Sequence, residues 1–394
     1  MSEKLAIYIH IPFCVRKCLY CDFLSGPSST EDRINYIAAL CNEIESVSKD
    51  CRDRIVGSIF FGGGTPSMLS ADDMLRIMNK IRDSFILSDD CEISMEINPG
   101  TVDEEKIYGY KVAGINRMSI GLQSAVDDEL RVLGRIHTLR DFENTYSLIT
   151  KAGIHNVNVD LMSGIPEQNL DSFKRTLDYV TSLTPKPTHI SAYSLIIEEG
   201  TPFYDMELNV PSEETDREMY KITNDILCSC GYHRYEISNY ALEGYECEHN
   251  KVYWKRGDYL GLGLGAASLM DNVRWNNTSD MKEYLEAFEI GEEVENRGVM
   301  KDDKAVNMPD VRKEYQQLSV EEQMEEFMFL GLRLMEGVTE SDFKNTFGEA
   351  YPEQYVKTIK KYTSMGMLKC IENRVFLTEE GINVSNVILS EFLF

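Results

Sequence analysis

The chain has 394 residues, of which 43% are hydrophobic, and its 66 acidic and 40 basic residues give a net charge of −26. This length suits two or three domains, and the hydrophobic share is sufficient for a full core. The negative charge argues against a nucleic-acid partner and against binding to an anionic membrane surface.

Export and membrane insertion are not expected. No run of 18 apolar residues occurs, and no small-residue cleavage site follows the short apolar start. Three of the ten cysteines lie within eight residues, whereas the others are mostly scattered. Clustered thiols of this kind indicate metal ligands rather than a disulfide framework. We therefore expect a cytoplasmic protein with no integral membrane segment.

Apolar runs alternate with amphipathic stretches as far as about residue 240. The expected strands cover residues 5–11, 55–61, 92–97, 117–121, 156–162 and 189–196. The expected helices cover residues 31–49, 71–84, 103–112, 139–151 and 169–183. This order predicts an α/β fold with a parallel sheet, either an open doubly wound sheet or an incomplete (β/α) barrel of six units.

Polar and glycine residues at the expected strand ends favour the barrel. They are Cys14, residues 62–65, Glu96, Gln123, Asp160 and Tyr193. In β/α barrels the active site gathers at this C-terminal rim and draws on several strands. We therefore expect an incomplete (β/α)6 barrel, similar to a TIM barrel, over residues 1–240.

The pattern changes after residue 240. Residues 241–318, glycine-rich at 257–270 and polar at 292–318, are expected to form a connecting region. A helical period returns at Ser319, and the end of the chain predicts two short strands closed at Glu372 and Asn373, followed by a helix. Residues 319–394 are thus predicted to be a smaller, mostly helical, winged-helix-like domain.

The strongest motif is a C-x3-C-x2-C loop formed by Cys14, Cys18 and Cys21 just after the first expected strand. Three thiolates at this spacing can hold a [4Fe–4S] cluster and leave the fourth iron open to a cofactor or substrate. A zinc site or reduced surface thiols are the alternatives. Zinc would normally need a fourth close ligand, and His10 and Asp22 are poor candidates on an expected strand.

This loop resembles that of the radical S-adenosylmethionine (SAM) superfamily. The chain further resembles the oxygen-independent coproporphyrinogen III oxidase family and, within it, the heme-chaperone branch called HemW. The matching segments are YIHIPFCxxxCxYCDF (8–23), FFGGGTPSML (60–69), MEINPG (95–100), RMSIGLQS (117–124), LGRIHT (133–138), NVDLMSGIP (158–166), YEISNYA (235–241), HNKVYW (249–254) and GLGLGAAS (261–268). The resemblance implies that SAM chelates the open iron, and that an electron from the cluster can cleave it to a 5′-deoxyadenosyl radical.

The resemblance also assigns residues to these cofactors. Those implied to contact SAM or line the cluster are Tyr8, Tyr20, Gly63, Gly64, Thr65, Glu96, Gln123, Arg135 and Asp160. For each of them the alternative is a polar residue satisfied within the protein or, for the glycines, a tight turn.

Three features separate the heme-chaperone branch from the catalytic branch. Phe23 stands where the catalytic branch has a further cysteine, and the first strand is expected at Leu5 without that branch's N-terminal extension. The third feature is HNKVYW, which matches the HNxxYW motif of the chaperone branch. The resemblance implies His249 as a ligand of heme iron, with Cys247 as an alternative thiolate and a packed, hydrogen-bonded histidine as the plain alternative.

We therefore expect a protein that holds a [4Fe–4S] cluster, SAM and heme as cargo, and delivers heme to acceptor hemoproteins. An electron donor and a homodimer belong to the same expectation. The alternative function is coproporphyrinogen III oxidation to protoporphyrinogen IX by radical decarboxylation, and a radical enzyme acting on another tetrapyrrole is a third.

Overall fold

The computed structural model describes residues 4–288 and 311–394. Twelve strands form one mixed sheet in the order β12–β11–β10–β9–β1–β2–β3–β4–β5–β6–β8–β7. Their bounds are β1 (Leu5–Ile11), β2 (Ile55–Gly63), β3 (Ile86–Ile97), β4 (Arg117–Gln123), β5 (Asn156–Ser163), β6 (His189–Ser194), β7 (His233–Arg234), β8 (Asn239–Ala241), β9 (Tyr259–Leu262), β10 (Ala267–Met270), β11 (Val273–Asn277) and β12 (Arg312–Gln317).

Strands β1 to β6 are the parallel core of this sheet, and they confirm the six expected strands. Each pairs in parallel with the next. Their apolar side chains are buried, as in parallel sheets covered on both faces. Strand β3 begins at Ile86, six residues earlier than expected, because Ile86 and Leu87 pair with the start of β2.

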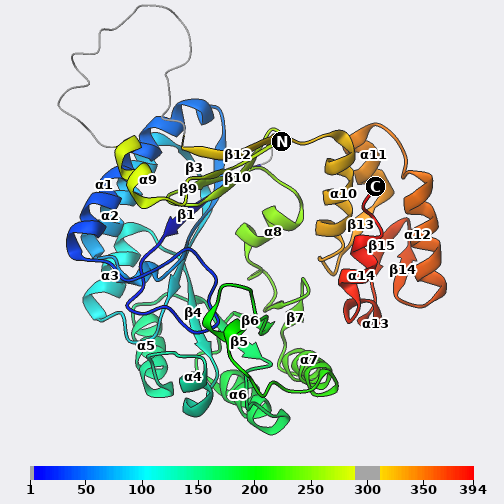
Figure 1. The fold of residues 1–394 in the computed structure, drawn as a ribbon, viewed down its shortest axis with the longest axis horizontal. Coiled ribbons are helices and arrows are strands. Elements are labelled where there is room, and N and C mark those ends of the chain that lie inside the picture. The colour runs from blue at the N-terminus through cyan, green and yellow to red at the C-terminus, as the bar shows by residue number, and fades with distance from the viewer. Residues whose placement is uncertain (1–3, 289–310) are drawn as a thin grey trace, which may run out of the picture.

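Helices cover the outer face of this core (Figure 1). They are α1 (Thr30–Val47), α2 (Ala71–Ser84), α3 (Glu104–Ala113), α4 (Asp127–Val132), α5 (Leu139–Lys151), α6 (Leu170–Ser182) and α7 (Glu213–Ser229), with short 3-10 helices η1 (Ser48–Cys51), η2 (Pro66–Met68) and η3 (Pro202–Asp205). Capping boxes at Ser29, Ser70, Thr138 and Asn169 fix where four of them begin. None of the helices in the described residues is long and apolar enough to cross a bilayer.

The sheet does not close on itself. Among the described strands, β12 and β7 are the two edges. This open, curved arrangement with outer helices is the incomplete barrel that the sequence predicts (Figure 1).

Residues of the expected connecting region extend the main sheet. Strand β9 pairs in parallel with β1, and β10, β11 and β12 follow in antiparallel order. Close packing explains a glycine in this region, because a Cβ at Gly261 would lie 2.2 Å from the carbonyl oxygen of Ala267. The region also contains α8 (Glu248–Trp254) and α9 (Met281–Phe288). Most of the polar stretch at 292–318 lies outside the described residues, and the division of the chain into three parts stays a prediction.

The C-terminal residues have a hydrophobic core of their own. They form α10 (Val320–Gly331), β13 (Val338–Thr339), α11 (Glu340–Phe347), α12 (Glu353–Ser364), β14 (Leu368–Ile371), β15 (Arg374–Leu377), α13 (Glu379–Ile382) and α14 (Ser385–Ser390). The predicted hairpin at Glu372 and Asn373 is confirmed. Both residues have positive φ, 51° and 63°, as the tightest hairpin turns require.

Polar contacts join this C-terminal domain to the main sheet. Glu326 of α10 forms ion pairs with Arg256, at 2.9 Å, and with Arg274, at 2.7 Å. A β-bridge joins Glu236 to Leu334. In Figure 1 α8 lies between the main sheet and the C-terminal domain.

Candidate functional site

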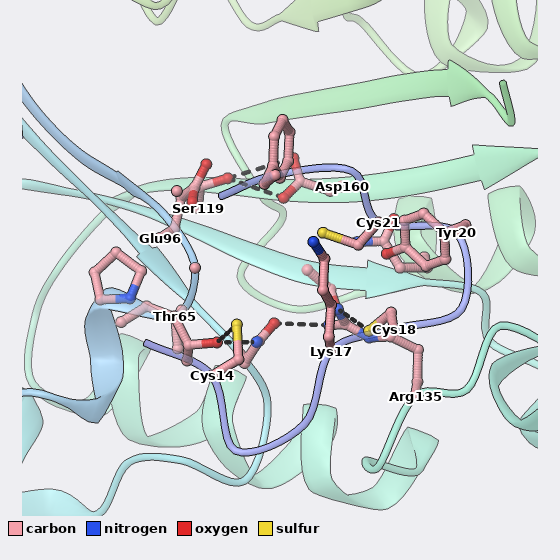
Figure 2. Close-up of a pocket in the computed structure, with 18 of the residues that line it drawn as sticks. Cys14, Lys17, Cys18, Tyr20, Cys21, Thr65, Glu96, Ser119, Arg135 and Asp160 are labelled. Carbon is pink, nitrogen blue, oxygen red and sulfur yellow. Dashed lines mark hydrogen bonds between the residues drawn. The ribbon is translucent and has the colours of Figure 1, made fainter. Parts of the chain in front are cut away.

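A cavity of about 370 Å³ lies at the C-terminal ends of β1 to β6. Each of these strands, or the loop after it, contributes to its wall (Figure 2). The lining includes eleven of the thirteen residues predicted for the cluster, SAM or heme: Cys14, Cys18, Tyr20, Cys21, Gly63, Gly64, Thr65, Glu96, Gln123, Arg135 and Asp160. Tyr8 and His249 do not line it.

The loop after β1 brings three thiols to this cavity. Backbone hydrogen bonds fix it to the rest of the protein, from Cys14 N to Gly26 O at 2.9 Å and from Leu19 N to Leu133 O at 3.1 Å. Burial raises the pKa of the Cys21 thiol. Among the described residues, no three His, Cys, Asp or Glu side chains are placed to hold a single metal ion. The thiols therefore surround a volume rather than converge on one point.

A hydrogen-bond network connects two of these thiols. Thr65 Oγ1 donates to Cys14 Sγ at 3.5 Å, and Asn98 Nδ2 donates to Thr65 Oγ1 at 2.7 Å. Arg135 donates from Nη2 to Asn98 Oδ1 at 2.7 Å and from Nη1 to Cys18 Sγ at 3.7 Å. Donors of this kind stabilise thiolates, which are the form of cysteine that binds metal. Asn98 was not predicted as a site residue, although it belongs to the quoted MEINPG segment.

The glycine run at the end of β2 fits closely against the strand and loop beside it. Gly63 has φ of 105°, and a Cβ there would lie 2.4 Å from the His10 ring. A Cβ at Gly64 would lie 2.7 Å from the carbonyl oxygen of Phe13. The amides of Gly64 and Thr65 already donate to β1 and its loop. These two amides are therefore already partnered within the protein, and contact of Gly63, Gly64 and Thr65 with SAM stays a prediction.

Two buried carboxyl groups enter the cavity wall from β3 and β5 (Figure 2). Burial, and then the charge of Asp160, raises the pKa of Glu96 to about 8. Burial also raises the pKa of Asp160, whose carboxylate accepts hydrogen bonds from Asn158 at 2.7 Å and Ser119 at 3.1 Å. A cationic ligand between the two carboxyl groups would relieve their repulsion and favour ionised Glu96.

Further residues of the cavity wall come from the cysteine loop and from the end of β4. Burial raises the pKa of Tyr20 to about 12, and Arg135 opposes this shift. Gln123 lies at a register shift between β4 and β5, with φ of 68°. Phe23 is 61% exposed and lines the cavity beside the cations Arg16 and Lys17, which the sequence reasoning did not select. In the sequence, the sign that these two cations belong to the site is their place between two of the cluster cysteines.

Tyr8 lies beneath the cavity rather than in its wall. Its hydroxyl shares a hydrogen bond with His10 Nδ1 at 3.1 Å, and its ring stacks on Phe60. Burial, followed by the charge of Glu96, raises its pKa well above the usual value. Tyr8 can therefore influence the cavity through Glu96, although it is not one of the residues that line it.

His249, in the first turn of α8, is buried inside the protein with both ring nitrogens partnered. Nδ1 lies 3.0 Å from Ser58 Oγ and Nε2 lies 2.8 Å from Tyr253 Oη. The ring stacks on Phe60, and burial, then the charge of Arg117, lowers its pKa to about 3. Cys247 is buried too. The structure therefore shows the packed, hydrogen-bonded alternative, and heme ligation by His249 stays a prediction.

Comparison with known proteins shows which family this chain belongs to. The radical SAM superfamily matches residues 8–180, and the HemN C-terminal domain matches residues 318–384. The heme chaperone HemW of Bacillus subtilis is 33% identical over 391 residues, covering 98% of each chain. That of Lactococcus lactis is 32% identical, covering all of this chain and 98% of the relative. The chain belongs to the HemW family of radical SAM proteins.

A further HemW relative and a solved structure agree with this placement. HemW of Escherichia coli is 40% identical over 263 residues, or 66% of this chain and 69% of its own. The solved structure of coproporphyrinogen III oxidase (HemN) from Escherichia coli, described as a radical SAM enzyme, superposes with a TM-score of 0.82 over 99% of this chain and 90% of its own. At 21% identity that likeness establishes the fold.

Membership in the radical SAM superfamily implies a [4Fe–4S] cluster and SAM, and the cavity of this HemW-family chain fits both. Cys14, Cys18 and Cys21 provide three thiols around one volume, with hydrogen-bond donors on two of them. Glu96 and Asp160 provide acceptors for the cationic and hydroxyl groups of SAM. The donor set therefore matches what the two cofactors need.

Proposed function

We propose that this protein binds heme and delivers it to acceptor hemoproteins. The observation that carries the proposal is the likeness, over 98% or more of both chains, to proteins named heme chaperone in two bacteria. In the same proposal Cys14, Cys18 and Cys21 hold a [4Fe–4S] cluster, and SAM lies in the cavity above β1 to β6. When bound, the cluster supplies a one-electron reductant beside SAM.

The protein's own residues have separate tasks in this arrangement. Thr65 and Arg135 donate hydrogen bonds to the sulfur atoms of Cys14 and Cys18 and so hold these two cluster ligands in place. Glu96, whose pKa is raised to about 8 by burial and by the charge of Asp160, gives up its proton when the cationic cofactor binds. Gln123 and Tyr20 are proposed to contact the cofactor from β4 and from the cysteine loop.

The alternative is oxidation of coproporphyrinogen III by the same architecture. The likeness to the solved oxidase is one of fold, and Phe23 offers the cavity an aromatic ring where the catalytic branch, by the resemblance above, has a thiol. We therefore favour heme delivery. The proposal further includes an electron donor for the cluster, a homodimer as the working assembly, and the cytoplasm, where thiols stay reduced, as the compartment.

One anaerobic experiment tests the proposal. Cluster-reconstituted protein is titrated with heme, mixed with an apo-hemoprotein, and separately supplied with coproporphyrinogen III, SAM and a reductant. We expect a Soret band at micromolar heme and transfer of that heme to the acceptor. Absence of heme binding, or conversion of coproporphyrinogen at enzymatic rates that Cys18→Ala abolishes, would overturn the proposal.

A further inference from the structure

A second cavity, of about 640 Å³, lies between the end of α8 and the C-terminal domain. Its wall comes from segments far apart in the sequence: the end of α8 with the loop after it, the turn at Asp271 and Asn272, helices α10 and α11, and the start of β15. Figure 1 shows α8 facing α10 across this region. The volume is within the range of sites that enclose cofactor-sized ligands.

Part of this wall is aromatic and aliphatic. Trp254, Phe327 and Phe347 line the cavity together with Leu334 and Val338. The guanidinium of Arg333 lies 4.5 Å from the centre of the Trp254 ring. Trp254 Nε1 is buried and has no hydrogen-bond partner among the described residues. The wall therefore offers aromatic rings suited to a flat apolar ligand.

Three of the four acidic residues of the wall have partners other than the cations of the wall, and the fourth, Glu336, pairs with Lys255. Asp258 and Asp271 both pair with Arg54, outside the wall. Asp342 accepts a hydrogen bond from Thr339 Oγ1 at 2.5 Å, at the start of α11. Their negative charge is thus partly neutralised within the protein.

Of the three cations of the wall, Arg256 pairs with the buried Glu326, whereas Lys255 and Arg374 are less fully used. Arg374 donates to the carbonyl oxygen of Glu336 at 2.9 Å and has no ion pair with a carboxylate among the described residues. Lys255 pairs with Glu336 at 3.0 Å, but both side chains are about half exposed, at 55% and 54%. Exposed pairs of this kind are weak and exchange readily. Two positive groups are therefore available at one cavity.

We propose that this cavity between the domains binds the tetrapyrrole cargo. Heme is a flat, largely apolar ring with two carboxylates, and here the ring packs against Trp254 and the phenylalanines while the carboxylates bind Arg374 and Lys255. The inference rests on the proposed heme-delivery function and deepens it. It also separates the cargo from the buried His249, whose ring nitrogens bond to Ser58 and Tyr253.

The test compares matched variants of the full-length protein in heme titrations followed at the Soret band. Arg374→Gln removes a cation from the cavity, whereas Lys344→Gln removes one from an exposed site on α11 that does not line it. Asn345→Trp fills the cavity from an exposed position on the same helix. We expect Arg374→Gln to weaken heme binding about tenfold, as loss of a charge-assisted hydrogen bond does, and Lys344→Gln to leave it unchanged.

Heme dimethyl ester, which lacks the carboxylates, provides the second arm. Arg374→Gln should leave binding of the ester unchanged, whereas Asn345→Trp should weaken binding of both ligands. If wild-type protein binds heme and neither variant differs from it, the cavity is not the site, although heme delivery stands. Loss of binding in His249→Ala with normal binding in Arg374→Gln and Asn345→Trp also overturns the inference. If the wild-type protein binds no heme, the proposed function itself fails.

Discussion

The cavity above β1 to β6 and the surroundings of His249 lie on the same sheet but differ in how their polar groups are satisfied. At the cavity, Glu96 and Asp160 both belong to the wall and have raised pKa values, and the thiols surround an open volume. Around His249, both ring nitrogens and the backbone amide have partners inside the protein. The cavity residues thus border an open volume in which two carboxyl groups repel each other, whereas the His249 ring is enclosed by its partners within the protein.

The largest expected effect concerns the cluster cysteines. Replacing Cys14, Cys18 or Cys21 by alanine removes one of three thiolates that have no protein substitute in the cavity wall. We expect loss of most iron and acid-labile sulfide from anaerobically reconstituted protein, measured chemically and by visible absorbance. Cys228→Ala, at an exposed site outside the cavity, is the matched control. Zinc bound by the loop, with no iron and sulfide, would contradict the cluster assignment.

The buried charges beneath the cavity give the next largest effect. Arg117 is fully buried, with Nε 4.0 Å from Glu92, and Glu92 accepts hydrogen bonds from the amides of Glu248 and His249. Arg117→Met would leave that carboxylate uncompensated and lower the free energy of unfolding by about 3–5 kcal/mol. Arg131→Met, which breaks an exposed pair with Asp128, should cost less than about 1 kcal/mol. Urea unfolding measures the free energy of unfolding of both variants. An equal decrease in the two variants would contradict this explanation.

Cofactor binding should depend on pH through Glu96. Because the pKa of Glu96 is raised to about 8, the group is protonated at neutral pH before the cofactor binds and must ionise to attract a cation. Affinity for SAM should therefore rise with pH and level off above pH 8. At pH 6.5, which lies 1.5 units below the pKa of Glu96, the affinity for SAM should be roughly 30-fold below that plateau, because the ionised fraction falls about tenfold per pH unit. Calorimetry should show a flat profile for Glu96→Gln, and a pH-independent wild type would refute the assignment.

The smallest effect concerns His249 and stability. The pKa of its ring is lowered to about 3, so the folded protein keeps His249 neutral while the unfolded chain binds a proton below pH 6.5. Its contribution to stability is present above pH 6.5 and declines as the pH falls toward 3. As the pH falls from 6.5 to 5.5, protonation of this histidine in the unfolded chain should lower the free energy of unfolding by about 1 kcal/mol. His249→Asn should show a shallower acid slope in urea unfolding; an unchanged slope would mean that the ring is accessible to protons.

The sequence predicted most of the architecture that positions the cofactor cavity. Continuous apolar runs predicted β1 to β6, because parallel strands are buried on both faces. The cysteine spacing, the strand ends and the resemblance to a known family together pointed to eleven of the residues that line the cavity. Local pattern also predicted the turn at Glu372 and Asn373. These features depend on neighbours in the chain or on the shared rim of a β/α fold.

Only the tertiary structure decided the remainder. Strand β9 pairs with β1 across about 250 residues of chain, and no local pattern at 257–270 specifies that partner. The same holds for His249, whose burial depends on Ser58 and Phe60 of another strand, and for the second cavity, built from α8, α10, α11 and β15. Residue spacing determines which side chains share an element, whereas burial and unused hydrogen-bonding capacity arise only when distant elements pack together.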